Sequence, residues 1–268
     1  MAEIMAIWNK NTQNYLGNNK TLYEAFVMTD KDGNVMNATG SASNISIAAG
    51  DVNGYSHINK FGYSGADING TATVWDGNAA DAEYPYQAAS TITATGASTD
   101  DDGKTIEIQG LNSSYVSTTE TITVGGAASV SSFVRVFRAR MVSSTNTVVI
   151  SVIQSGHAVA KILAGNGQTL MAVYTIPAGK TGYLLKFQGS MDKSNVSVIF
   201  KLLSKPFSVS NGAFNIKGQW GTQGGNSVNY DYPVPLVFTE KTDIKVNVTN
   251  SATCGVGAIF DLILVDNA

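Results

Sequence analysis

The feature that most constrains the fold of this chain is a regular alternation of apolar and polar residues that begins at Thr91. Ile106 and Ile108 share one face of a candidate strand, and Ile122 and Val124 repeat the pattern. Successive side chains of a strand point to opposite faces, so a period of two predicts strands with one buried face. Further candidate strands, spaced by roughly 10–14 residues, follow at 147–154, 158–163, 169–176, 182–188, 195–203, 213–219, 229–238, 243–249 and 256–265. This spacing predicts an all-β protein with a jelly-roll-like antiparallel β-sandwich.

Composition supports that fold class. Charged residues make up only 14% of the chain, against about 25% in typical soluble domains. Long surface helices need Glu, Lys and Arg on their polar face, so this composition disfavours them. An apolar share of 43% is enough for a packed core and too high for a disordered chain.

The candidate elements divide the chain into three regions. Residues 1–53 hold apolar side chains without a sustained period and are predicted to form an extended N-terminal arm. Residues 54–144 are predicted to form a smaller β-lobe that begins with an aromatic, irregular stretch. The sandwich is predicted to span 145–268, with Pro233 and Pro235 confining their strand to a sheet edge or a bulge. It is predicted to end in a central strand buried on both faces, Ile259–Val265, with Leu262, Leu264 and Val265 in the core.

Charge is divided unevenly along the chain. Residues 1–130 contain 14 Asp and Glu against 5 Lys and Arg, whereas residues 131–268 contain 6 against 12. All three arginines lie on, or directly after, one candidate strand at 133–138. Arginine forms bidentate pairs with carboxylates. We therefore expect an interface of the arm and this strand with a neighbouring subunit or lobe, carried by Trp8, Tyr23, Phe26, Arg135, Arg138 and Arg140. The alternatives are chance clustering of charge and an ordinary strand edge kept soluble by arginine.

Residues that could carry out chemistry are few. Cys254 is the only cysteine, so no disulfide can form within the chain, and His57 and His157 are the only histidines. The Asp100-Asp101-Asp102-Gly103 segment lacks the alternating spacing of a calcium loop, which favours a solvated hairpin turn. No nucleophile elbow or metalloprotease motif occurs. The sequence therefore predicts a protein that is not an enzyme and has no catalytic residues, cofactor or metal.

Neither nucleic acid nor a membrane is an expected partner. The net charge is −3, so no global basic field attracts nucleic acid. The N-terminus lacks the basic and apolar regions of a signal peptide, and no run of about 18 apolar residues occurs. We expect the chain to be made and folded in a cytoplasm.

A series of segments between Gly54 and the C-terminus carries a family resemblance. They are Gly54–Gly62, the segment ending in Trp75-Asp76-Gly77, Thr105–Leu111, Thr119–Val124, Gly167–Leu170 with Tyr174–Leu184, Pro235–Leu236 with Glu240–Ile244, and Phe260–Asp266. In this order they resemble a family of virion structural proteins of tailed bacteriophages, mainly marine phages. Residues 1–53 are not covered by the resemblance.

The resemblance implies a non-enzymatic component of the virion, assembled in the host cytoplasm. Within it, we expect a head decoration or cement protein that binds and stabilises the capsid lattice. The expected partners are the major capsid protein and further copies of the chain, as a trimer at local threefold positions. Two alternatives remain: a tail or fibre-attachment adaptor with tail proteins as partners, and a carbohydrate-binding receptor-recognition protein that uses the aromatic stretch 55–86.

Overall fold

The structure is a computed structural model that describes residues 28–29, 35–36, 44–77, 88–207 and 213–267, with the backbone alone for 28–29, 35–36 and 66–69. The chain separates into two compact units, 1–56 and 57–268. In the first unit, β1 (Met28–Thr29) pairs with β2 (Val35–Met36), and α1 (Asn44–Ala49) follows. The described part of the predicted N-terminal arm thus contains two short strands and a short helix.

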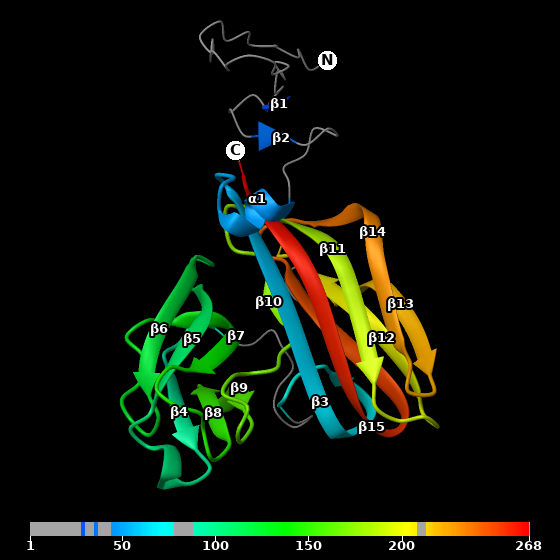
Figure 1. The fold of residues 1–268 in the computed structure, drawn as a ribbon. Helices are drawn as coiled ribbons and strands as arrows, with labels where there is room; N and C mark the ends of the chain where they lie inside the picture. The colour runs from blue at the N-terminus through cyan, green and yellow to red at the C-terminus, as the bar shows by residue number, and fades with distance from the viewer. Residues whose placement is uncertain (1–27, 30–34, 37–43, 78–87, 208–212, 268) are drawn as a thin grey trace, which may run out of the picture. The chain divides into compact units, whose positions relative to one another are not determined.

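The second unit contains a β-sandwich built from long antiparallel strands that bend (Figure 1). The first half of β15 (Asp243–Asp266) pairs with β12 (Ser197–Lys205), and the second half pairs with β11 (Lys180–Met191). On its other edge β15 pairs with β3 (Tyr55–Thr73). Hydrogen bonds between Asn59 and Asp261 at one end and between Thr73 and Asn247 at the other show that β3 runs antiparallel beside both halves of β15.

The strand order is that of a jelly roll. β14 (Ser227–Phe238) pairs with β11, and β13 (Asn215–Gln223) pairs with β12. One sheet therefore consists of the first part of β3, the second half of β15, β11 and β14. The other consists of the last part of β3, the first half of β15, β12 and β13, and the short strand β10 (Val173–Thr175) pairs with the first residues of β15. Numbered along the sandwich, these orders are 1-8-3-6 and 2-7-4-5, the two Greek-key sheets of a jelly roll. The predicted all-β, jelly-roll-like antiparallel sandwich is confirmed.

Aromatic side chains fill the space between the two sheets. Phe187 of β11 stacks on Trp220 of β13 at a centroid distance of 4.3 Å, and its ring lies 6.1 Å from that of Phe200 on β12. On β15, Leu262 and Leu264 point into the same core and are buried. The last strand is central, as predicted. The prediction that it is buried on both faces is wrong, because its outer face is only half covered, and Val265 lies on that outer face.

Residues 74–172 form a second β module, here called the insertion, between β3 and the short strand β10 (Val173–Thr175). In its described residues it contains two three-stranded sheets and one 3-10 turn, η1 (Thr99–Asp101). Its sheets are β4 (Ile92–Gly96), β8 (Ile150–Gln154) and β9 (His157–Ile162), and β6 (Ser117–Thr123), β5 (Thr105–Asn112) and β7 (Phe133–Met141). The predicted boundary at 53/54 lies three residues before the division between the two compact units, and the predicted boundary at 144/145 falls inside the insertion. β3 pairs with the sandwich strand β15, and β8 pairs with β4 of the insertion.

The insertion leaves and rejoins the sandwich at one point. Val74 N donates to Val246 O (2.8 Å), Ala172 N donates to Val74 O (3.0 Å), and Val246 N donates to Ala172 O (3.1 Å). The Trp75-Asp76-Gly77 segment lies just inside this point. A Cβ on Gly77 would lie 2.0 Å from the Trp75 ring, so only glycine leaves room for the buried indole. Asp76 accepts a hydrogen bond from Leu170 N (2.9 Å), which ties the departing chain to the returning one.

Candidate functional site

Arg135 on β7 forms a buried, bidentate ion pair with Asp243 on β15. The Nε–Oδ1 distance is 2.7 Å and the Nη2–Oδ2 distance is 3.0 Å. Thr175 Oγ1 donates a third hydrogen bond to Asp243 (2.7 Å), and Arg135 also donates to the Val134 carbonyl. Both charged residues are less than a tenth exposed. The pair therefore joins the insertion to the sandwich within one chain.

The other two arginines also have partners inside the chain. Arg140 pairs with Glu107 on the neighbouring strand β5, at 2.7 and 2.9 Å, and this contact lowers the pKa of Glu107. The guanidinium of Arg138 lies 5.4 Å from the centroid of the Phe61 ring on β3. The carboxylate that binds Arg135 comes from the sandwich of the same chain, which is a neighbouring lobe, and a contact of the arginines with another subunit stays a prediction. Trp8, Tyr23 and Phe26 lie outside the described residues, and an interface formed by the arm stays a prediction.

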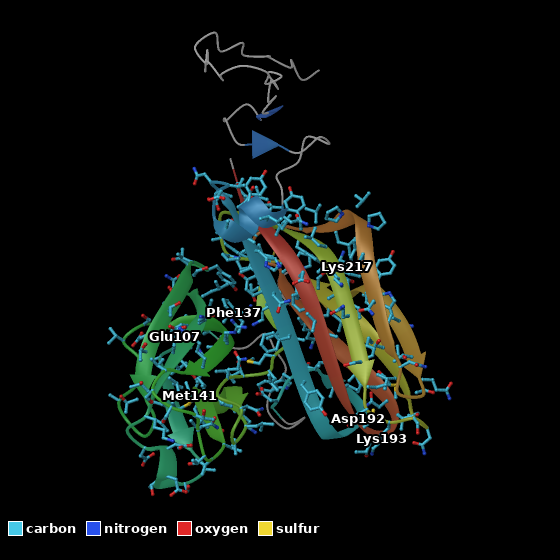
Figure 2. All side chains as sticks on the ribbon, viewed as in Figure 1. Glu107, Phe137, Met141, Asp192, Lys193 and Lys217 are labelled. Carbon is cyan, nitrogen blue, oxygen red and sulfur yellow. The ribbon has the colours of Figure 1, made fainter. Side chains whose placement is uncertain are left out.

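Lys60 of β3 is a second buried basic group between the sandwich and the insertion. Its ammonium donates to the carbonyl of Phe137 on β7, and Nζ lies 5.4 Å from the centroid of the Phe137 ring. Phe137 is labelled in Figure 2. Lys60 is 5% exposed. Burial, and secondarily the charge of Arg138, lowers the pKa of Lys60 from 10.5 to about 7. Lys60 is therefore largely neutral in the folded chain above that pH.

We expect the free energy of unfolding to depend more steeply on pH in the natural chain than in a Lys60→Met variant. Between about pH 7 and 10.5 the unfolded chain holds the Lys60 proton and the folded chain does not. Stability therefore rises with pH in this window, by at most about 1.4 kcal/mol per pH unit. Asp76, whose pKa burial raises to about 8, acts with the opposite sign below that pH in both chains and cancels in the comparison. Urea unfolding from pH 7 to pH 10 measures both slopes, and equal slopes would contradict the prediction.

The acidic turn at Asp100–Asp102 is a structural anchor. Asp101 is fully buried and accepts hydrogen bonds from Thr147 N, Val148 N and Lys104 Nζ at 2.7–3.0 Å. Burial opposes ionisation of Asp101, but these donors outweigh it and hold its pKa well below the usual value. The predicted exposure to solvent is confirmed for Asp100, Asp102 and Gly103 and is wrong for Asp101. The turn is no hairpin, because β4 and β5, which it joins, belong to different sheets.

The free edges of the sandwich expose large apolar side chains. β14 and β13 are the outermost strands of their sheets and follow one another through the Gly224-Gly225 turn, where both glycines have positive φ. The exposed residues on these strands are Ile216 (55%), Tyr230 (42%), Val234 (79%) and Val237 (60%). The prediction from Pro233 and Pro235 is confirmed, because β14 is an edge strand whose pairing with β11 is interrupted between Asp231 and Leu236. We call these two strands the open edge.

The described residues show no cation site and no membrane-spanning helix. Within them, no three His, Cys, Asp or Glu side chains converge as a metal ion would require. None of the helices in this part of the chain is both long and apolar enough to cross a bilayer.

Comparison with known proteins gives little guidance. No protein-family model and no curated protein sequence matches the chain. Among solved structures, a structure of infectious bursal disease virus, Gx strain, aligns with 80% of this chain and 76% of its own at 10% identity and a TM-score of 0.20. T=1 particles derived from infectious bursal virus align with 80% and 74% at 9% identity and the same TM-score. An alignment at that TM-score does not establish a common fold.

Proposed function

We propose that this chain is a structural protein of a bacteriophage virion, and within that class a head decoration protein. It binds the major capsid protein at local threefold positions as a trimer and stabilises the shell by burying surface across subunit boundaries. Copies assemble from the host cytoplasm onto the particle. The resemblance of residues 54–268 to virion proteins of tailed phages supports the class. The jelly roll is compatible with it, since that fold is used in viral shells and equally in lectins and other proteins.

The observation that carries the proposal is the open edge. Unpaired edge strands with exposed apolar side chains are a liability for a solitary protein, because they template association with other chains. Most of the surface of the two consecutive edge strands is accessible to solvent. Their exposed apolar residues are Ile216, Tyr230, Val234 and Val237. Covering such groups by a neighbour releases the free energy that their exposure costs. Pro233 and Pro235 lack an N–H, so around Val234 we expect packing of side chains and no continuous added strand.

We expect a Val234→Asp/Val237→Asp double variant to lose binding to the particle while it folds normally. Both side chains are mainly exposed, so a carboxylate is tolerated in the free chain and costs free energy only when a partner covers it. The measurement is co-sedimentation of purified protein with particles that lack it, beside size-exclusion light scattering for the oligomeric state. Val130→Asp is the matched control, because Val130 is 94% exposed on the insertion and away from both edge strands.

The outcome distinguishes the proposal from its rivals. Unchanged binding and an unchanged oligomeric state in the double variant would overturn the assigned role of the open edge. The number of copies of the protein in each natural particle also indicates where the protein is located. Copies that scale with the capsid lattice support decoration, whereas a small fixed number at one vertex would assign the chain to the tail as an adaptor.

A further inference from the structure

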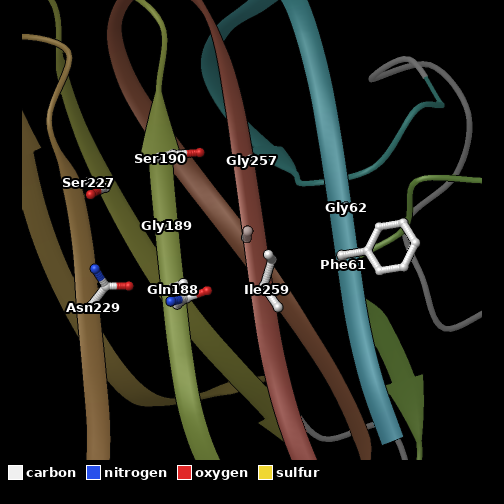
Figure 3. A pocket seen from close by; sticks show the side chains of 10 residues that line it. Phe61, Gly62, Gln188, Gly189, Ser190, Ser227, Asn229, Gly257 and Ile259 are labelled. Atoms are coloured by element: carbon white, nitrogen blue, oxygen red, sulfur yellow. The ribbon is translucent and has the colours of Figure 1, made fainter.

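The outer face of the sheet β3–β15–β11–β14 carries a shallow groove of about 460 Å³ (Figure 3). Phe61, Ile259, Gln188 and Asn229 form one row across the four strands, with Gln188 in register with both Asn229 and Ile259. The next row is formed by Gly257, Ser190 and Ser227. Phe187 and Phe260, which alternate with these residues, point into the core, so the groove is open to solvent.

The aromatic side chain of Tyr63 lies next to this groove. Tyr63 of β3 extends over β15 where Gly255 and Gly257 have no side chains. A Cβ on Gly255 would lie 2.5 Å from Tyr63 Oη, and a Cβ on Gly257 would lie 3.7 Å from its Cδ2 and 3.0 Å from Ser190 Oγ. Tyr63 therefore requires glycine at position 255, whereas a Cβ on Gly257 would only be in van der Waals contact with the ring. Tyr63 is 41% exposed, which leaves part of it available to a ligand.

The residues that line the groove are uncharged, and the two charged groups beside it are already engaged. Arg138 lies against the Phe61 ring, and Asp192, which is close to Tyr63, accepts a hydrogen bond from Gly255 N (2.9 Å). The lining contains two amides and two hydroxyls, and no residue in it is ionisable.

The charges on the next row are already paired: Lys186 with Asp231 at 3.8 Å, and Asp261 with His57 and Asn59. An ionic ligand would find no free counter-charge in the lining. A purely apolar ligand would bury the amides without hydrogen-bond partners, which costs free energy.

We propose that this groove binds a neutral oligosaccharide chain. Sugar hydroxyls both donate and accept, as amides and serine hydroxyls do, and the apolar face of a sugar ring packs on an aromatic ring such as that of Tyr63. Gln188 and Asn229 supply directional hydrogen bonds, and Ile259 supplies an apolar contact, whereas the Phe61 ring points away from β15 and lies against Arg138 (Figure 3). The groove shares β14 with the open edge, but its lining contains none of the exposed apolar residues that carry the proposed virion role. The inference therefore does not depend on that role.

The test is an array of neutral glucose-, galactose- and mannose-based oligosaccharides beside uronic-acid and sulfated ones, probed with the full chain. The strongest neutral oligosaccharide is then titrated by calorimetry. We expect binding to neutral oligosaccharides only, weakened about tenfold or more by Gln188→Ala/Asn229→Ala and by Tyr63→Ala, and retained in Tyr63→Phe. The matched control is Gln219→Ala/Gln223→Ala, which removes two exposed amides from β13 on the other sheet.

Three outcomes would overturn the proposal: no retained neutral oligosaccharide, retention of acidic ones alone, or equal affinity of the groove variant and the natural chain. A change of oligomeric state in the groove variant would assign this face to a second copy and would also overturn it. Thermal unfolding checks that each variant is folded. Unchanged binding of the groove variant to particles separates this result from the fate of the virion role.

Discussion

A chain that lacks Ile259–Ala268 is expected to lose the cooperative unfolding transition of the sandwich. The deletion removes the second half of β15, which lies between β3 and β11 and has no substitute in the sheet. It also removes Phe260, Leu262 and Leu264 from the core, all at most 2% exposed. Burial of each such side chain is worth about 1.5–3 kcal/mol, and a folded domain is stable by only about 5–15 kcal/mol.

Far-UV circular dichroism during thermal and urea unfolding measures this effect. The matched control removes residues 1–20, which belong to the other compact unit, and is expected to leave the midpoint of the second unit unchanged. A truncated chain that unfolds cooperatively at the full-length midpoint would show that the sandwich closes without its last strand.

Arg135→Met is expected to destabilise the folded chain by about 3–5 kcal/mol, because it leaves the Asp243 carboxylate buried without its cation. Arg140→Met is the matched control. It breaks a pair in which the arginine side chain is 50% exposed, and such pairs are worth about 1 kcal/mol or less. The substitution Asp243→Leu replaces the buried carboxylate by an apolar side chain and, with Arg135→Met, defines a double-mutant cycle. The double variant Arg135→Met/Asp243→Leu is expected to be more stable than Arg135→Met alone, since no unpaired charge remains.

Urea unfolding of the four chains in this cycle gives the coupling free energy between Arg135 and Asp243. If Arg135→Met costs no more than Arg140→Met, the ion pair does not hold the insertion and the sandwich together. The insertion would then be held to the sandwich by apolar packing, by the Lys60 and Arg138 contacts, and by the backbone hydrogen bonds around Val246.

The alternation of residues predicts the sandwich strands well and fails at β3. β11 to β14 lie within a few residues of the candidate strands, and the two candidates at 243–249 and 256–265 are the two halves of β15. Residues 55–73 read as an irregular aromatic stretch, yet they form a strand of 19 residues. The reason is visible in its inner face, where Lys60 and Gly62 stand in place of apolar residues. Lys60 contacts Phe137, and a Cβ on Gly62 would lie 2.3 Å from Ala172 N.

The candidate sites depend on contacts between distant parts of the chain. Arg135 could be singled out from its residue type, but its partner Asp243 is 108 positions away and is one of six carboxylates in the second half. The aromatic stretch 55–86 was a candidate glycan platform. The structure divides it, with Trp75 in the core and Phe61 and Tyr63 at the outer groove. No local pattern brings Gln188, Asn229 and Ile259 beside them, because that requires the register of four strands.

Both ends of the insertion meet at Val246, so the insertion enters and leaves the sandwich at a single point, as a separate module. The chain departs after Val74 and returns at Ala172, and these two residues are hydrogen-bonded to one another. The insertion can therefore be lengthened, exchanged or deleted during evolution without a change in the path of any sandwich strand. One condition limits such grafts. Asp243 and Lys60 are buried against the insertion. A different inserted module must therefore supply a cation for Asp243 and a carbonyl for Lys60, or apolar residues must replace both Asp243 and Lys60.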